Sequence, residues 1–289
     1  MRRLLVFGLG YSASRFVLRA GAGFGHVAGT ARTPEAAAER AAALGVETLA
    51  FDGLSAGPAL RGAVAAATHI LVSIPPDATG DPVLRALADD IAAAPALAWI
   101  GYLSTVGVYG GFDGAWIDED TPIRPTAERN RRRAEVERAW IDLGARAGRA
   151  VQVFRLAGIY GPGQNAVRNL REGTARRIVK PGQVFNRIHV DDIAGALIAG
   201  IGRPAVGPLI NVADDEPAPP QDVIAYAAHL LGREPPPEID FEAADLSPMG
   251  RSFYGENKRV SNRRLRRELG CDLLYPTYRE GIRACLDED

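Results

Sequence analysis

The chain has 289 residues, a length that suits a nucleotide-binding core with a modest appended lobe. Hydrophobic residues make up 47% and charged residues 24%, a composition that excludes disordered, fibrous and membrane proteins. Lysine and arginine total 34 against 35 for aspartate and glutamate, so the net charge of -1 does not favour nucleic acid or a membrane as partner. We therefore expect a small-molecule ligand, bound by local charges.

Cysteine content and the first residues indicate a cytoplasmic protein. The two cysteines, Cys271 and Cys285, are too few for a disulfide framework and lack the spacing of metal ligands, so we expect no metal site. The initial stretch MRRLLVFGLG has an apolar run too short for a secretion signal. No run approaches the roughly 18 apolar residues of a membrane span.

Apolar runs and helical patterns alternate through the first half of the chain. Residues 3–7 predict a strand, and the segment after GLG predicts a helix. Further strands are expected in HVAGTAR, ETLAFD, HILVSIPP, LAWIGYLST and AVQVFRL, with helices at about 34–44, 81–94 and 126–147. Continuous apolar strands joined by helices are typical of a parallel sheet covered on both faces. We predict an α/β fold with a Rossmann-type, doubly wound parallel sheet.

The second half of the chain is less regular and predicts a smaller lobe. RIHVDDIAGALIAGI indicates a strand that passes into a helix, and LINVADDEP a strand that ends in a proline-rich loop. Proline clusters at 217–220 and 235–237 bracket another helix. We expect a Rossmann domain in residues 1–162, completed by about 186–214. Residues 163–185 and 215–289 are expected to form a C-terminal substrate-binding lobe.

The segment GLGYSA after the first strand matches the GxGxxA pattern of dinucleotide-binding loops. Gly8 permits the tight turn, Gly10 lets the backbone approach a pyrophosphate, and the small Ala13 lets the helix pack on the strand. Tyr11 and Ser12 begin the helix, whose N-terminus would face the phosphates. A packing turn is the alternative. The position within a βαβ unit favours NAD(P) binding.

The end of the second strand, GTARTPE, carries no acidic residue. An acid there would hydrogen-bond the ribose 2′-hydroxyl of NAD and repel the 2′-phosphate of NADP. Thr30, Arg32 and Thr33 instead offer donors suited to a phosphate. The sequence therefore favours NADP over NAD, the alternative being that Arg32 is a solvated loop charge.

These segments resemble the extended short-chain dehydrogenase/reductase superfamily, in particular its NAD-dependent epimerase/dehydratase group, over nearly the whole chain. The similar segments are GLGYSA, FD at 51–52, LSTVGVYG, EDTPIRP, RLAGIYGPG, NRIHVDDIA, LINVADDEP and KRVSN. The resemblance implies that Asp52 contacts the adenine and that Tyr160 lies in a loop beside the nicotinamide. Ser73, Ile74 and Pro75 should border the cofactor, because the carboxyl end of their strand faces the crevice.

One part of the family pattern is missing. In that family a YxxxK motif supplies a tyrosine acid/base and a lysine that lowers the tyrosine pKa and holds the nicotinamide ribose. Here the segment PTAERNRRR puts Arg129 at the tyrosine position and Arg133 at the lysine position, and residues 125–137 contain neither tyrosine nor lysine. An arginine cannot give up a proton near neutral pH. Arg133 could bind ribose hydroxyls and Arg129 a carboxylate, phosphate or oxyanion, unless both lie on a solvated helix face.

The resemblance also suggests hydroxyl groups for catalysis. Thr105 corresponds to the family's catalytic Ser or Thr, with Ser104 beside it, and either hydroxyl could instead satisfy the backbone at the strand end. Tyr109 is the nearest candidate proton donor in the sequence, although the corresponding tyrosine is commonly a pocket residue in the family.

Four residues are assigned to substrate binding: Arg129, Arg187, His189 and Tyr254. His189 has a second interpretation, in which it packs at the domain junction while Asp191 caps the following helix. An apolar seam of Val136, Ala139, Trp140 and Leu143 makes a homodimer a further expectation.

Two functions of different classes follow. The first is an NAD(P)-dependent oxidoreductase or epimerase/dehydratase-like enzyme acting on a small polar, sugar-like or anionic carbonyl or alcohol, including a variant that cycles a tightly held cofactor. The second is a non-catalytic NADP(H)-binding sensor or regulatory protein that kept the cofactor loop and lost the catalytic pair.

Overall fold

The computed structural model describes residues 1–287. Its centre is a seven-stranded sheet with the order β3-β2-β1-β4-β5-β7-β11, and every neighbouring pair is parallel. The strands are β1 (Arg3–Phe7), β2 (His26–Ala31), β3 (Glu47–Ala50), β4 (His69–Val72), β5 (Trp99–Thr105), β7 (Ala150–Leu156) and β11 (Leu209–Val212). This arrangement confirms the predicted α/β fold with a doubly wound parallel sheet.

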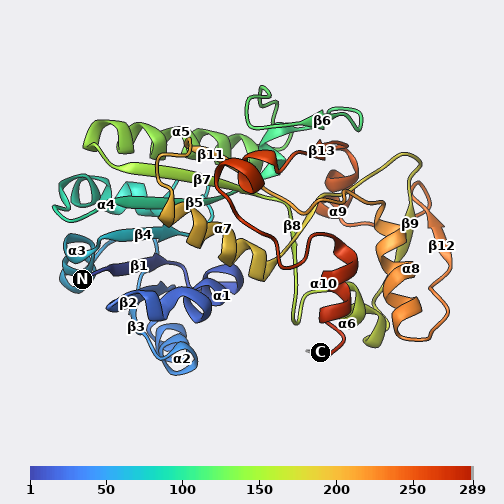
Figure 1. The fold of residues 1–289 in the computed structure, drawn as a ribbon, viewed down its shortest axis with the longest axis horizontal. Coiled ribbons are helices and arrows are strands. Elements are labelled where there is room, and N and C mark those ends of the chain that lie inside the picture. Colours follow the sequence, from blue (N-terminus) through green and yellow to red (C-terminus); the bar gives the residue numbers. More distant parts are fainter. Residues whose placement is uncertain (288–289) are drawn as a thin grey trace.

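Helices cover both faces of this sheet (Figure 1). One face carries α1 (Tyr11–Ala20), α2 (Pro34–Leu44) and α7 (Val190–Gly202), and the other α3 (Pro58–Ala66), α4 (Pro82–Ala93) and α5 (Glu128–Ala147). Leu4 and Val6 pack in the core under α1 and α7, whereas Leu5 and Phe7 pack in the core under α3 and α4. Side chains alternate along a strand, so a strand covered on both faces must be apolar throughout.

Capping residues define several helix ends. Thr33 and Pro34 begin α2, with the Thr33 hydroxyl accepting a hydrogen bond from the Ala36 N–H. The Asp81 carboxylate accepts hydrogen bonds from the Val83 and Leu84 N–H groups and so begins α4. The helices expected at about 34–44, 81–94 and 126–147 are confirmed, the last beginning two residues later at Glu128.

The other elements gather at the right of Figure 1, beyond the carboxyl edge of the sheet. They are α6 (Ala166–Arg171), α8 (Pro220–Leu230), α9 (Pro248–Tyr254), α10 (Tyr278–Ala284) and the strand pairs β8 (Gly158–Tyr160) with β10 (Arg187–His189), β9 (Arg177–Val179) with β12 (Glu238–Asp240), and β6 (Trp116–Ile117) with β13 (Arg259–Val260). Residues 259–273 lie against the central sheet, because Val260, Leu265 and Leu269 pack in its core under α1 and α7. These residues were expected in the substrate lobe. Apart from them, the division of the chain into a Rossmann domain and a substrate lobe stays a prediction.

The predicted dimer seam faces the protein's own sheet. Val136, Trp140 and Leu143 are buried in the core under α3, α4 and α5, and the Trp140 indole N–H donates to the Asp81 carboxylate at 3.1 Å. Helix α5 thus uses this face within the chain, which removes the basis for a homodimer through it.

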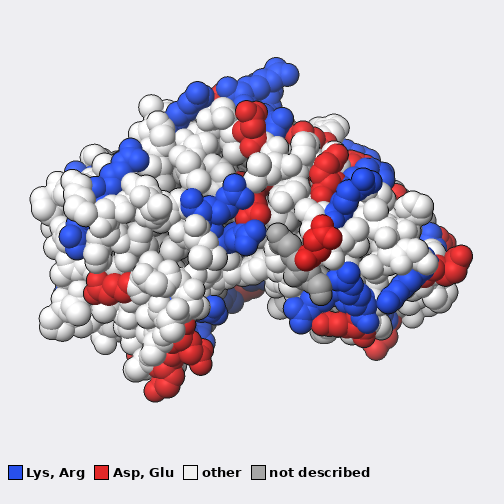
Figure 2. Space-filling view, turned by 60° about the horizontal axis from the view of Figure 1, so that its bottom comes forward, with Lys and Arg blue, Asp and Glu red and all other residues white. Residues whose placement is uncertain are grey.

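Two surface properties bear on the expected partners. Among the described helices, none is long and apolar enough to cross a membrane. On the face drawn in Figure 2, basic and acidic side chains are interspersed, so this face has no continuous basic surface of the kind that binds nucleic acid.

A buried ion pair joins α5 to the sheet. The Arg155 guanidinium on β7 donates to the Glu137 carboxylate on α5 at 2.7 Å, and the Ser104 hydroxyl at the end of β5 donates to the same carboxylate at 2.5 Å. Glu137 is 3% exposed and Arg155 4% exposed. The pair therefore fixes α5 against the ends of β5 and β7 without contact with solvent.

We predict that Glu137→Gln lowers the free energy of unfolding by about 3–5 kcal/mol, because it leaves the Arg155 charge buried without a counter-charge. Urea denaturation would measure the change. Glu135→Gln is the matched control, since Glu135 is exposed on the same helix and should change stability by less than about 0.5 kcal/mol. Equal stability of the two variants would contradict the prediction.

Candidate functional site

The glycine loop lies at the centre of the sheet's carboxyl edge, between the ends of β2 and β4. Gly8 has a φ of +87°, and a Cβ on it would lie 2.8 Å from Cγ1 of Ile74. The Gly8 N–H donates to the Thr30 hydroxyl at 3.0 Å, and the Leu9 N–H to the Thr30 carbonyl at 2.9 Å. Both the backbone conformation and the close approach of Ile74 require glycine at position 8.

Gly10 has open space beside it. Its φ of −82° suits any residue, and a Cβ there would meet no atom of the described chain within 4 Å. The space lies before the N-terminus of α1, where backbone N–H groups and the helix dipole favour a phosphate. Ala13 is fully buried and Ser12 nearly so, so both pack the helix against the sheet. The loop therefore fits the pyrophosphate of a dinucleotide.

The three candidates for a 2′-phosphate contact differ in exposure. Arg32 is exposed and has no carboxylate partner within residues 1–287. Thr33 is also exposed, but its hydroxyl oxygen caps α2. Thr30 is fully buried with its hydroxyl beneath Gly8, so it supports the loop and cannot reach a phosphate in solvent. The structure thus corrects the role of Thr30 and leaves Arg32 as the free cation.

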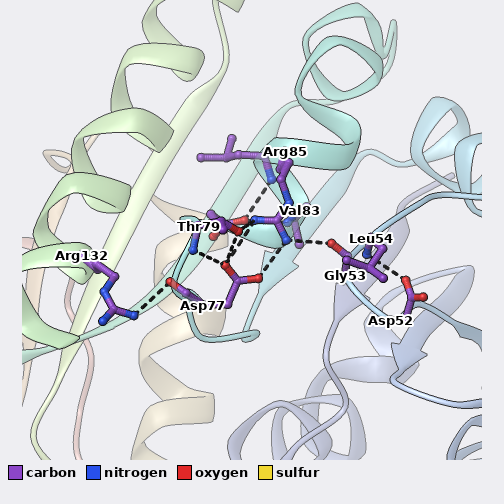
Figure 3. Close-up of polar contacts among 10 residues, drawn as sticks. Asp52, Gly53, Leu54, Asp77, Thr79, Val83, Arg85 and Arg132 are labelled. Atoms are coloured by element: carbon purple, nitrogen blue, oxygen red, sulfur yellow. Dashed lines mark hydrogen bonds and ion pairs between the residues drawn. The ribbon is translucent and has the colours of Figure 1, made fainter. Parts of the chain in front are cut away.

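The loops that follow β3 and β4 are tied together at the same edge of the sheet (Figure 3). The Arg85 guanidinium donates to the Gly53 carbonyl at 2.9 Å, to the Asp77 carboxylate at 2.9 Å and to the Thr79 hydroxyl at 2.7 Å. These bonds, Arg85 foremost, hold the pKa of Asp77 below its ordinary value. Asp52, the predicted adenine contact, is exposed beside this cluster.

A cavity of about 540 Å³ lies at the same edge, beyond β5 and β7. Its polar walls come from the end of β5, from the first turns of α5 and from residues 184–187 and 250–258. Polar side chains on these walls include Thr105, Arg129, Asn130, Arg133, Arg187 and Lys258. The cavity thus joins five of the predicted site residues, which come from distant parts of the sequence: Thr105, Arg129, Arg133, Arg187 and Tyr254.

Arg129 and Arg133 project into the cavity from successive turns of α5. Arg129 donates to the Ser252 hydroxyl at 2.9 Å and lies over the Phe253 ring, with 5.1 Å between the guanidinium carbon and the ring centre. Arg133 donates to the Leu103 carbonyl at 2.6 Å. Neither guanidinium has a carboxylate within 4 Å in the described chain. Both guanidinium groups thus line the cavity without a carboxylate partner. Arg129 is exposed and Arg133 half-buried, and their role in a site stays a prediction.

Arg187 and Tyr254 form the wall opposite the sheet. Arg187 donates to the carbonyls of Phe185 and Ala218, both at 3.0 Å. Burial raises the pKa of Tyr254, which Arg187 partly opposes. Behind Arg187, burial raises the pKa of Asp214 to about 8, again against Arg187.

Two residues predicted to be catalytic lie outside the cavity. Ser104 is 4% exposed and donates to Glu137, so it belongs to the buried ion pair. Tyr109 is fully buried, and its hydroxyl donates to the Asn211 side chain at 2.8 Å. Burial raises the pKa of Tyr109. Neither residue can contact a substrate, which corrects both predictions.

Tyr160 and His189 also have structural positions. A Cβ on Gly281 would collide with the Tyr160 hydroxyl, so Tyr160 packs tightly against α10, and its place beside a nicotinamide stays a prediction. His189 is 1% exposed and accepts the Asp191 N–H through Nδ1 at 3.2 Å, and burial lowers its pKa to about 4. Neutral His189 caps α7 itself, whereas Asp191 pairs with Arg15. Tyr11 ties its helix to the following loop by donating to the Pro162 carbonyl.

Three polar residues of the cavity were not predicted. Asn130 is buried at the start of α5, and Glu256 and Lys258 form an ion pair of 2.8 Å after α9. The segment KRVSN was recognised only as a landmark of the resemblance. Its position gave no indication that Lys258 would line the cavity and contact the Gly110 carbonyl.

The chain matches no model of a known protein family. It is 31% identical over 185 residues to a 3-diazoavenalumate denitrifying reductase of a Streptomyces species, covering 57% of this chain and 58% of that protein. It is 32% identical over 190 residues to protein YeeZ of Escherichia coli, covering 65% of this chain and 62% of YeeZ. The chain thus spans less than two thirds of the curated relatives that it matches.

Solved structures match the whole chain. A conserved protein of unknown function from Silicibacter pomeroyi is 50% identical, with a TM-score of 0.87 and 99% of each chain covered. A dTDP-glucose 4,6-dehydratase from Bacillus anthracis in complex with NAD is 16% identical, with a TM-score of 0.80 over 100% of this chain and 96% of that one, and shares the fold. Fold and glycine loop together define a Rossmann-type protein. Its structural neighbours are NAD-dependent epimerase/dehydratase-like enzymes of the short-chain dehydrogenase/reductase type, which the chain resembles.

We predict that Gly10→Ala weakens NADPH binding by about tenfold or more without changing the melting temperature, because the added methyl fills the space expected for the pyrophosphate. Isothermal titration calorimetry would measure the dissociation constant. Gly23→Ala is the matched control, since its Cβ also meets nothing within 4 Å and lies away from the loop. Unchanged NADPH affinity in Gly10→Ala would exclude this loop as the pyrophosphate site.

Proposed function

We propose that the chain is an NADP-dependent oxidoreductase or epimerase/dehydratase-like enzyme acting on a small anionic carbonyl or alcohol compound. The observation that carries this proposal is the cavity beside Thr105, into which Arg129 and Arg133 bring two guanidinium charges without carboxylate partners. Its volume of about 540 Å³ lies within the range of small-molecule sites.

The residues of the carboxyl edge fit the cofactor. Gly8 and Gly10 leave the pyrophosphate its space, Asp52 is exposed at the adenosine end, and Arg32 is the free cation for a 2′-phosphate. When bound, a nicotinamide cofactor supplies or takes the hydride. The relative from Bacillus anthracis holds NAD, so the preference for NADP rests on Arg32 alone.

In the cavity, the chain's own groups would bind and orient the substrate. The Thr105 hydroxyl oxygen accepts the Gly107 N–H at 3.1 Å, which leaves its proton to donate to a substrate oxygen. Arg129 and Arg133 are suited to a carboxylate or phosphate, because a guanidinium presents paired N–H donors. The reductase named among the curated relatives supports redox chemistry in this family.

A second candidate function is a non-catalytic NADP(H) sensor. It is favoured by the absence of tyrosine and lysine from residues 125–137. Both functions require cofactor binding, so turnover separates them. Purified protein with NADPH and a panel of sugars, aldehydes, ketones and oxo acids would consume NADPH if it is an enzyme. Tight binding without turnover, and without nucleotide released on denaturation, would favour the sensor.

Arg32→Asp should reverse the cofactor preference, because the carboxylate accepts a hydrogen bond from the ribose 2′-hydroxyl and repels a 2′-phosphate. We expect NADPH affinity to fall by about tenfold or more, with NADH affinity equal or higher. Fluorescence titration with both nucleotides would measure the ratio. Arg40→Asp makes the same charge change on an exposed residue of α2 and should alter the ratio little. An unchanged ratio of NADPH affinity to NADH affinity in Arg32→Asp would contradict the assignment of NADP as the cofactor.

Arg129→Leu should raise KM for anionic carbonyl substrates by about tenfold or more, because it removes a charge-assisted hydrogen-bond donor. KM for uncharged carbonyls and affinity for NADPH should change by less than about threefold. Steady-state kinetics with charged and uncharged members of the panel would measure both. Arg138→Leu, at an exposed position of α5, is the control. Equal effects on both substrate types would refute an anion-binding role.

A further inference from the structure

Lys258 has an unusual environment for a lysine. It is 5% exposed and lines the cavity, and its ammonium donates to the Gly110 carbonyl at 2.7 Å and to the Glu256 carboxylate at 2.8 Å. An ammonium has three protons to donate. Within residues 1–287, no acceptor lies within hydrogen-bond distance of the third. A buried lysine beside a cavity can therefore direct one N–H at a bound molecule.

Glu256 holds this lysine in place relative to Thr105. Its other carboxylate oxygen accepts the Thr126 hydroxyl at 2.9 Å and lies 3.5 Å from the Asn130 amide nitrogen. Asn130 packs against the turn after Thr105, since a Cβ on Gly107 would lie 2.8 Å from its amide nitrogen. The ion pair thus connects the segment after α9 with the start of α5 and with the end of β5.

Burial and Glu256 act on Lys258 in opposite directions. Glu256 pairs with it directly and favours the ammonium. Arg129 and Arg133 on α5 and Arg187 on β10 are further cations that line the same cavity. Burial lowers the pKa of Lys258, and Glu256 partly opposes this. Lys180 and Lys258 are the two lysines of the chain, so nearly all its other cationic side chains are arginines that cannot exchange a proton.

We propose that Lys258 is the proton donor and acceptor of the cavity, in place of the tyrosine that residues 125–137 lack. This rests on the proposed oxidoreductase function. In the direction of reduction, the carbonyl carbon takes a hydride from a reduced nicotinamide, and the C=O π pair moves to oxygen. The N–H bond of Lys258 then breaks as the new O–H bond forms. The neutral amine regains its proton from solvent water. In oxidation the amine takes the proton of the alcohol.

Kinetics of Lys258→Met and Lys258→Arg test this proposal. We expect both to lower kcat by about 100-fold or more with KM and NADPH affinity nearly unchanged, because arginine keeps the charge but cannot release a proton. In the wild type, the rate of reduction should fall as pH rises through the pKa of Lys258, since the ammonium is the reactive form. Lys180→Arg lies outside the cavity and is the control. Rescue by Lys258→Arg would show a merely structural charge and overturn the proposal.

A second measurement does not depend on turnover. In protein labelled with ¹³C-lysine, the two Cε signals can be assigned with Lys180→Arg and followed against pH. We expect Lys258 to titrate below Lys180. A Lys258 signal that titrates at or above that of Lys180 overturns the proposal. Wild-type protein that binds NADPH but turns over no substrate would instead overturn the proposed function, so the two failures are distinguishable.

Discussion

All seven strands of the central sheet run parallel, and this single constraint collects the candidate site at one edge. The strand order reverses direction between β1 and β4, and in such sheets the crevice opens outside the carboxyl ends at that point. Gly8 and Ile74 meet there so closely that no side chain fits at position 8. The glycine loop lies at this point, Arg32 and Asp52 lie to one side of it, and Thr105 and the cavity lie to the other. A dinucleotide that spans the edge would join them.

Hydrogen bonds and ion pairs among polar groups hold this edge together. Thr30 accepts the Gly8 N–H from beneath the loop, and Arg85 ties together the loops after β3 and β4. Glu137 and Arg155 fix α5 to the ends of β5 and β7. Because α5 also carries Arg129 and Arg133, the buried pair determines where the cavity's charges lie. Polar residues close to the site thus divide into those that shape it and those that face it.

The sequence predicted the fold well because the signals are local. Continuous apolar strands, the helical patterns between them and the glycines of the first loop each act within a few residues. It predicted the site less well, because the burial of a single side chain depends on contacts from distant segments. The Tyr109 hydroxyl contacts Asn211, 102 positions away, and Lys258 contacts Gly110, 148 positions away. Neither pairing leaves a pattern in one sequence.

The distribution of cations links these observations. Arginine is suited to binding a fixed anionic group, because its guanidinium stays charged and presents planar donors, whereas a lysine can exchange a proton when burial and neighbouring charges permit. The resemblance puts the cavity's α5 arginines at the positions of the tyrosine and lysine of the short-chain dehydrogenase/reductase pattern. The cavity's lysine comes instead from the segment after α9. If Lys258 transfers the proton, the catalytic site needs a residue from outside the Rossmann sheet. The contacts of Glu256 with Thr126 and Asn130 then serve catalysis by positioning Lys258. The activity of such an enzyme would depend on the packing of residues 250–258 against α5, whereas cofactor binding by a sensor would not.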